Sequence, residues 1–172
     1  NKLFFFGSME GEKTAQPGTT FRANTGGEPA AGSVTRVLAS DLTTLSGYLK
    51  SNFKYDTGAF QDYPFATPGR RVLAKFDYNL NGSNRIMFRY NQLASSTPVN
   101  LSSSGSLGFG RPTFTNNFLN YKNSNYSILE NIKSGIGEWN SVVKGTLTNS
   151  MIVGYTKQDE SRGDVGKLFP FV

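Results

Sequence analysis

Residues 72–91 read VLAKFDYNLNGSNRIMFRYN, with apolar and polar side chains alternating on both sides of a turn-like centre. One face of the first segment carries Phe76, and the matching face of the second carries Phe88. Alternation with a period of two is typical of a half-buried β-strand, and the composition of residues 81–84 is typical of a turn. This stretch therefore predicts a β-hairpin.

The same two segments also predict how the strands pair. A three-residue loop, Gly82 to Asn84, would bring the two apolar faces together and set Tyr78 opposite Phe88. It would also set Asp77 opposite Arg89 on the polar face. An opposite-charge pair across two strands contributes about 0.2–1 kcal/mol, so the chemistry of both faces favours one register.

Five strands are expected in the whole chain. Their predicted ranges are 2–12, 71–80, 85–94, 126–142 and 149–159. Two long loops, 13–70 and 95–125, separate them, whereas the other two connections are short. Loops in compact soluble domains have a median of about 4–6 residues, whereas outer-membrane barrels alternate short turns with long loops.

A helix is expected within the first long loop, from Ser40 to Phe53. Ser40 is a suitable N-cap, and the acidic Asp41 in the first turn complements the helix dipole. Leu42, Leu45 and Leu49 recur at spacings of three and four, which predicts one apolar stripe buried against the loop.

These features predict an all-β chain that is a section of a large antiparallel transmembrane β-barrel, with long extracellular loops of which one carries the helix. Five strands are too few to close a barrel, because the smallest barrels have about eight. The chain also begins at Asn1 rather than at a methionine, as a fragment or a processed product would.

The polar face of the hairpin is expected to line a wet barrel lumen. Its charged residues are Lys75, Asp77, Arg85 and Arg89. The alternative is that this is the solvated outer face of a soluble sheet, whose aromatic side chains would then fill an ordinary core.

Composition argues against several other classes of function. The chain has 18 Lys and Arg against 12 Asp and Glu, a net charge of +6, and no dense basic run, so nucleic-acid binding is not expected. It contains no cysteine and no histidine, which excludes disulfides, thiolate or histidine metal sites, and nucleophiles activated by histidine. We expect no enzyme activity and no cofactor.

Aromatic residues in the first loop are the candidate ligand contacts. They could stack on a sugar or a peptide, and the alternative is that they pack the loop onto itself and its helix. The four residues are Tyr55, Phe60, Tyr63 and Phe65.

Two acidic residues lie in the same part of the loop, Asp56 and Asp62. Together with loop carbonyls they could contribute to a calcium site. As a pair without a spaced third carboxylate, they are more simply explained as solvent-exposed side chains.

Several segments resemble one family of membrane proteins. Residues 1–11, NKLFFFGSMEG, resemble the strand found just after the plug domain in Oar-like TonB-dependent receptors. Residues 36–42 (RVLASDL), 69–93 and 153–162 (VGYTKQDESR) look like later segments of the same family, in the same order.

The resemblance implies a large barrel whose lumen is closed by a plug, in the outer membrane of a Gram-negative bacterium. It places Asn1 and Lys2 at a periplasmic turn and residues 14–69 outside the cell. It implies ligand uptake or export, with outer-membrane lipid, the rest of the barrel, the plug and an external ligand as partners. TonB would bind through an N-terminal region outside this chain. An adhesion or structural barrel and a soluble β-rich binding module are the alternatives.

Overall fold

The computed structural model describes residues 2–101 and 116–167, and the chain divides into two compact units. We call them the sheet unit and the loop unit. The sheet unit comprises Asn1–Lys13, Pro68–Ser96 and Leu129–Ser161. The loop unit comprises Thr14–Thr67, Thr97–Ile128 and Arg162–Val172.

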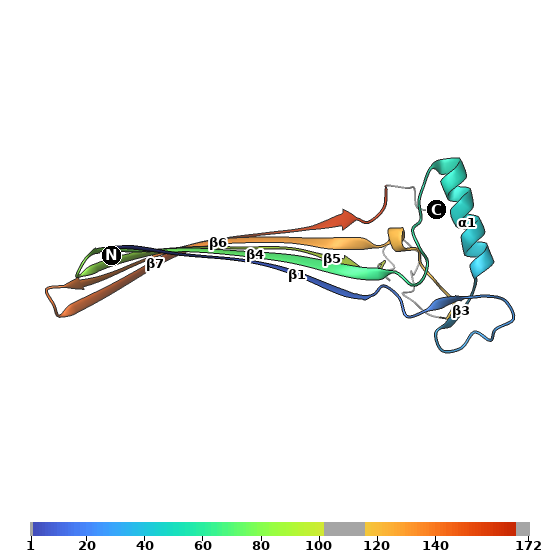
Figure 1. The fold of residues 1–172 in the computed structure, drawn as a ribbon, viewed down its shortest axis with the longest axis horizontal. Coiled ribbons are helices and arrows are strands. Elements are labelled where there is room, and N and C mark those ends of the chain that lie inside the picture. The colour runs from blue at the N-terminus through green and yellow to red at the C-terminus, as the bar shows by residue number, and fades with distance from the viewer. Residues whose placement is uncertain (1, 102–115, 168–172) are drawn as a thin grey trace, which may run out of the picture. The chain divides into compact units, whose positions relative to one another are not determined.

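Five long strands form one antiparallel sheet, as the sequence predicts. Their order in the sheet is β1-β4-β5-β6-β7, so each long strand lies beside the next long strand in the sequence (Figure 1). Most of them extend several residues beyond the expected ranges. The strands are β1 (Leu3–Pro17), β4 (Pro64–Asn81), β5 (Asn84–Val99), β6 (Tyr126–Val143) and β7 (Leu147–Asp164).

The register of the β4–β5 hairpin differs from the prediction by two residues. Tyr78 pairs with Ile86 rather than with Phe88, and Asp77 pairs with Met87 rather than with Arg89. A shift of two residues leaves every side chain on its predicted face, because the side-chain period of a strand is two.

The Asn81 side chain explains the tighter turn. Its Oδ1 accepts hydrogen bonds from the Ser83 backbone N–H and from Asn84 Nδ2, both at 3.0 Å. Asn81 consequently pairs with Asn84, which leaves only Gly82 and Ser83 in the loop. The register adjusts by an irregularity between Asn79 and Asn81.

The loop unit contains two short strands that the sequence did not predict. They are β2 (Arg22–Asn24) and β3 (Val34–Leu38), which pair in parallel. Helix α1 (Ala39–Phe53) follows β3 directly, and a 3-10 turn, η2 (Lys122–Ser124), precedes β6. No helix in the described ranges is long and apolar enough to cross a membrane.

The helix was predicted correctly, but its cap and its buried face were not. Its N-cap is Leu38, without a side-chain hydrogen bond, so Ser40 lies in the first turn instead of capping it. Leu42 is buried at 7% exposure against Ala23 and Leu119, whereas Leu45 is 47% exposed and Leu49 only half-buried. Only the first of the three leucines therefore belongs to the core, because the core lies beside the start of the helix.

Apolar burial is confined to one unit. Among the described residues, every buried apolar side chain lies in the loop unit: Ala23, Leu42, Tyr63, Phe65 and Leu119. The described part of the sheet unit has no buried apolar side chain on either face.

Candidate functional site

Charged residues on the polar face of the hairpin form one network. Asp77 accepts a hydrogen bond from Arg85 at 2.7 Å and forms an ion pair with Lys75 at 3.0 Å. The Asp77 side chain is only 14% exposed, because the two longer cations cover it. Arg89 lies opposite Lys75, and its Nε is buried without a hydrogen-bond partner in the described structure. The structure thus brings together three of the four predicted lumen residues and sets the fourth beside them.

A second ion-pair group lies further along the polar face. Arg71 of β4 approaches Glu10 at 3.4 Å and Glu12 at 3.6 Å, both from β1. A hollow of about 440 Å³ beside them is lined by further polar side chains, including Asn91 and Ser134. Sequence reasoning missed this group, because nothing in the local pattern links residues about sixty positions apart.

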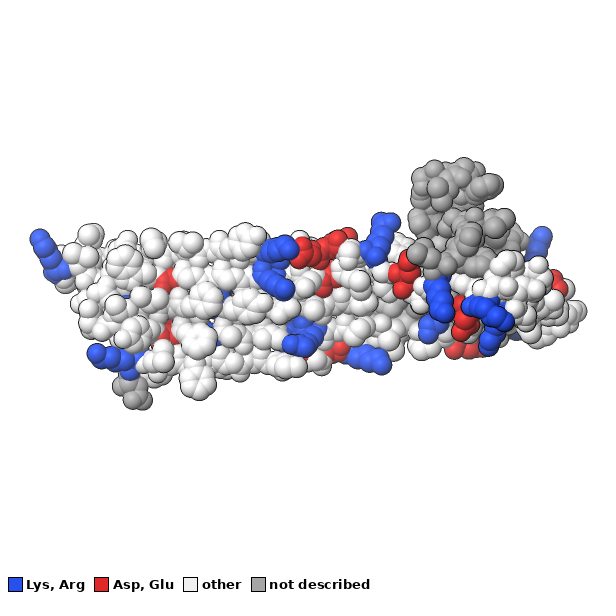
Figure 2. Space-filling model, turned by 90° about the horizontal axis from the view of Figure 1, so that it is seen from above, with Lys and Arg blue, Asp and Glu red and all other residues white. Residues whose placement is uncertain are grey.

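The opposite face, which we call the apolar face, has the more solvent-exposed side chains at the centre of the β4–β5 hairpin. Phe76 is 49% exposed and Phe88 is 48% exposed, whereas Lys75 and Arg89 on the polar face are half-buried. The apolar face continues onto β6, where an added Cβ on Gly135 would lie 3.9 Å from the Phe88 ring. In Figure 2 the half of the sheet nearest the tight turns carries few charged side chains, and charge gathers further along the strands.

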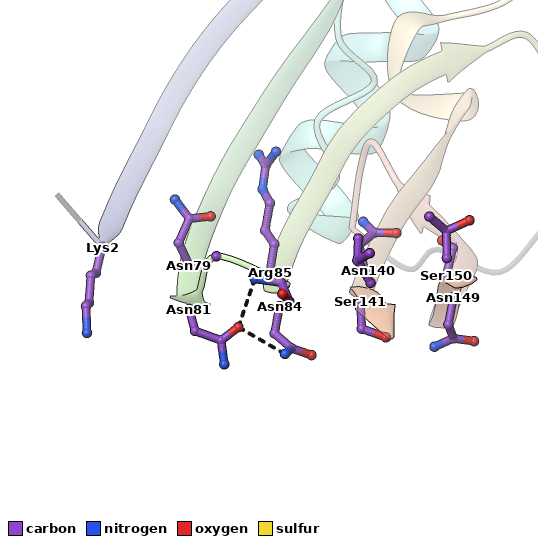
Figure 3. Close-up of a pocket in the computed structure, with 13 residues that line it drawn as sticks. Lys2, Asn79, Asn81, Asn84, Arg85, Asn140, Ser141, Asn149 and Ser150 are labelled. Atoms are coloured by element: carbon purple, nitrogen blue, oxygen red, sulfur yellow. Dashed lines mark hydrogen bonds between the residues drawn. The ribbon is translucent and has the colours of Figure 1, made fainter. Parts of the chain in front are cut away.

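The end of the sheet with the two tight turns holds a polar hollow of about 750 Å³ (Figure 3). Its lining is rich in amides and hydroxyls, with Lys2 and Arg85 as its cations and no carboxylate. The labelled side chains stand in a row along the ends of successive strands. The backbone N–H of Asn79 donates to the Lys2 carbonyl at 2.8 Å, which holds the start of β1 against β4.

This hollow can hydrogen-bond a polar partner. Asparagine amides both donate and accept, but none of its side chains is a general base or an activated nucleophile. The sequence pattern placed Asn81 and Asn84 in a turn and the other asparagines of this hollow within strands, so it did not group them as one site. Their recurrence near both tight turns was a signal that could have indicated a polar strand end.

Two of the four predicted ligand contacts lie in the interior of the loop unit. Tyr63 and Phe65 are each 5% exposed, and their ring centroids are 5.6 Å apart. Asn125 donates a hydrogen bond to the Tyr63 oxygen at 3.3 Å. For this pair the packing interpretation is correct, since neither ring offers a face to a ligand.

The other two candidates are half-buried. Phe60 packs edge-on against Tyr121, with ring centroids 6.3 Å apart, and Tyr55 lies just after helix α1. The structure therefore does not assemble the four aromatic residues into one binding surface.

Asp56 and Asp62 are exposed and make local hydrogen bonds. Asp56 accepts a hydrogen bond from the Gly58 N–H at 3.0 Å, and Asp62 accepts one from Gln61 at 3.2 Å. Across residues 2–101 and 116–167, no three acidic, histidine or cysteine side chains gather as a metal site would require. The structure gives the calcium hypothesis no third carboxylate.

A loop in the same unit is fixed by Glu28. Its carboxylate accepts hydrogen bonds from Arg22 and from both the backbone and the hydroxyl of Thr25. These hydrogen bonds, with that of Arg22 the largest cause, lower the pKa of Glu28 to about 2.

Comparison with known proteins adds no relative. No protein-family model, characterised protein or solved structure matches the chain.

Proposed function

We propose that the sheet unit is a section of an outer-membrane β-barrel, belonging to a TonB-dependent-receptor-like protein that moves a ligand across the outer membrane of a Gram-negative bacterium. The observation that carries the proposal is the inverted exposure of the sheet. In water, an antiparallel sheet packs its apolar face on a core and exposes the polar one. Here the side chains of Phe76 and Phe88 on the apolar face are exposed, while the Asp77 side chain on the polar face is largely buried.

The length of the apolar face suits a bilayer. On β4 it runs without a charge from Val72 to Leu80. Nine residues at about 3.4 Å each, tilted by about 40°, cover a height of about 20 Å. The apolar band of outer-membrane barrels is about 25 Å tall, so these strands reach across most of it.

The polar face suits a water-filled interior. Lys75, Asp77 and Arg85 form a charged network that would be costly in contact with lipid tails. In a barrel lumen the same network stays hydrated and gives the wall a local charge pattern that a passing ligand meets.

The edges of the sheet support a larger assembly. In the described structure β1 and β7 are edge strands. In a membrane an unpaired edge leaves backbone groups without hydrogen bonds, which costs several kcal/mol per group. Further strands on both sides would satisfy these groups, and the long connections would present the ligand-facing surface.

Single-cysteine labelling tests the membrane placement, since the chain has no cysteine of its own. In native outer membranes, Phe88→Cys is expected to resist a membrane-impermeant maleimide, while Arg89→Cys reacts from the aqueous lumen. Lys54→Cys in the loop unit serves as the exposed control. Fast labelling at position 88 with protection at position 89 would overturn the proposal and favour a soluble module.

A second test addresses the proposal that the parent protein is a TonB-dependent receptor. The coding sequence upstream of Asn1 is expected to specify a plug domain and a TonB box. A barrel gene without either would favour the adhesion or structural role.

A further inference from the structure

The apolar face ends in basic residues on four of the five long strands. On β1, β4, β6 and β7, one cation is the first charged side chain reached along that face from the tight-turn end. These residues, which we call the basic rim, are Lys13, Arg70, Lys133 and Lys157.

Contacts on the polar face fix the side on which the rim lies. Glu10, Glu12 and Arg71 meet on the polar face, so the alternating neighbours Lys13 and Arg70 belong to the apolar face.

The same argument holds for the other two strands. The hydroxyls of Ser134 and Thr156 hydrogen-bond at 2.9 Å. Ser134 also lines the polar-face hollow beside Arg71. Lys133 and Lys157, the next residues along, therefore project from the apolar face.

The rim has an excess of positive charge. Lys157 pairs with Asp159 at 3.0 Å, and both side chains are more than half exposed. Asp159 is the acidic residue of the apolar face in the described strands, and no ion pair joins the other three cations to a carboxylate there. Four cations against one carboxylate leave a net charge of +3 where the uncharged surface ends.

We propose that the basic rim binds the phosphates of anionic lipid headgroups, an inference that rests on the membrane placement proposed above. Long Lys and Arg stems can lie along the apolar band while their charged ends reach the headgroup level. Anionic phosphate matches this charge, and one cation at such a surface gives a preference of about fivefold. The tight turns lie at the opposite end of the strands, so the rim belongs to the leaflet nearer the long connections.

Tryptophan quenching by brominated lipid can measure this preference. The reporter is Leu129→Trp, four residues from Lys133 on the same face of β6, in a Trp139→Phe background. The parent protein, whose further strands close the proposed barrel and whose tryptophans outside this chain are replaced by phenylalanine, is placed in vesicles of equal phosphatidylcholine and phosphatidylglycerol. Only one of the two lipids is brominated in each sample. We expect brominated phosphatidylglycerol to be enriched about three- to fivefold beside the reporter. High salt should weaken the enrichment.

The variant Lys133→Gln/Lys157→Gln should bring the enrichment close to equality. The native Trp139, the only tryptophan of this chain, serves as a control reporter near the tight turns, where the variant should change nothing. Equal quenching by both lipids at position 129 with the rim intact would overturn the inference and leave the membrane placement standing. A preference that survives both substitutions would also overturn it. No quenching by either lipid at either position would overturn the membrane placement itself.

Discussion

The shorter of the two ion pairs of Asp77, at 2.7 Å, joins it to Arg85, a diagonal neighbour on β5. The direct cross-strand partner of Asp77 is Met87. The diagonal arrangement follows from the two-residue turn at Gly82 and Ser83. It leaves Arg89 opposite Lys75, with no carboxylate in direct register.

A double-mutant cycle can detect this arrangement. Asp77→Asn and Arg85→Gln should couple by about 0.3–1 kcal/mol, since the Arg85 side chain is 56% exposed and solvent screens the pair. Urea unfolding in detergent gives the free energies. The matched cycle with Arg89→Gln should show weaker coupling. Stronger coupling of Asp77 to Arg89 would support the three-residue loop instead.

Placing a charge on the apolar face should be costly only in a membrane. In the larger barrel proposed above, Phe88→Arg is expected to lower the unfolding free energy in lipid vesicles by about 2–4 kcal/mol if residue 88 lies near the bilayer midplane. Met87→Arg, on the polar face of the same strand, is the control and should cost less. Since Phe88 is already 48% exposed, no loss of stability in vesicles would indicate that water, not lipid, covers this face.

The lowered pKa of Glu28 predicts that the stability of its loop depends on pH. Its pKa is lowered from 4.5 to about 2 in the folded chain, so its carboxylate stabilises the fold fully above the unfolded pKa. That contribution falls as the pH drops below 4.5 and is lost once the pH passes about 2. Protease resistance of the loop, compared between the native chain and Glu28→Gln, should differ at neutral pH and converge in strong acid. A difference that stays constant over this range would contradict the assignment.

Gly18 leaves no room for a side chain. An added Cβ would lie 2.1 Å from the Tyr63 ring and 3.0 Å from its carbonyl oxygen, and the buried ring has little space to move. Gly18→Ala should therefore destabilise the loop unit by about 1–3 kcal/mol. Gly11→Ala is the control, because nothing lies within 4 Å of its added Cβ. Thermal unfolding compares the two variants, and equal melting temperatures would show that the ring gives way.

Local periodicity explains what could be predicted from the sequence. The strands and faces around Phe76 and Phe88 follow from strict alternation, and the helix follows from its leucine spacing. The register depended on hydrogen bonds of the Asn81 side chain, which no hydrophobic pattern encodes. The burial of Leu42 rather than Leu45 depended on Leu119, which is distant in the sequence.

The contacts of the candidate site were predictable only where they lie within one local segment of the sequence. The charged face around Asp77 was predictable, because it lies within one hairpin. The contacts of Arg71 with β1 and the burial of Tyr63 needed tertiary pairing between distant segments. Strand β2 has three residues, too few to show any period.

The strand order also sets the order in which the sheet can assemble. The hairpins β4–β5 and β6–β7 join neighbouring segments through tight turns, so each can form within microseconds once its strands meet. Strand β1 reaches β4 only after residues 18–63, with their own short strands and helix, have been drawn into a loop. Because closing a longer loop costs more entropy, β1 should join last, and the rate of that step should respond to the length of the connection more than to any side chain within β4.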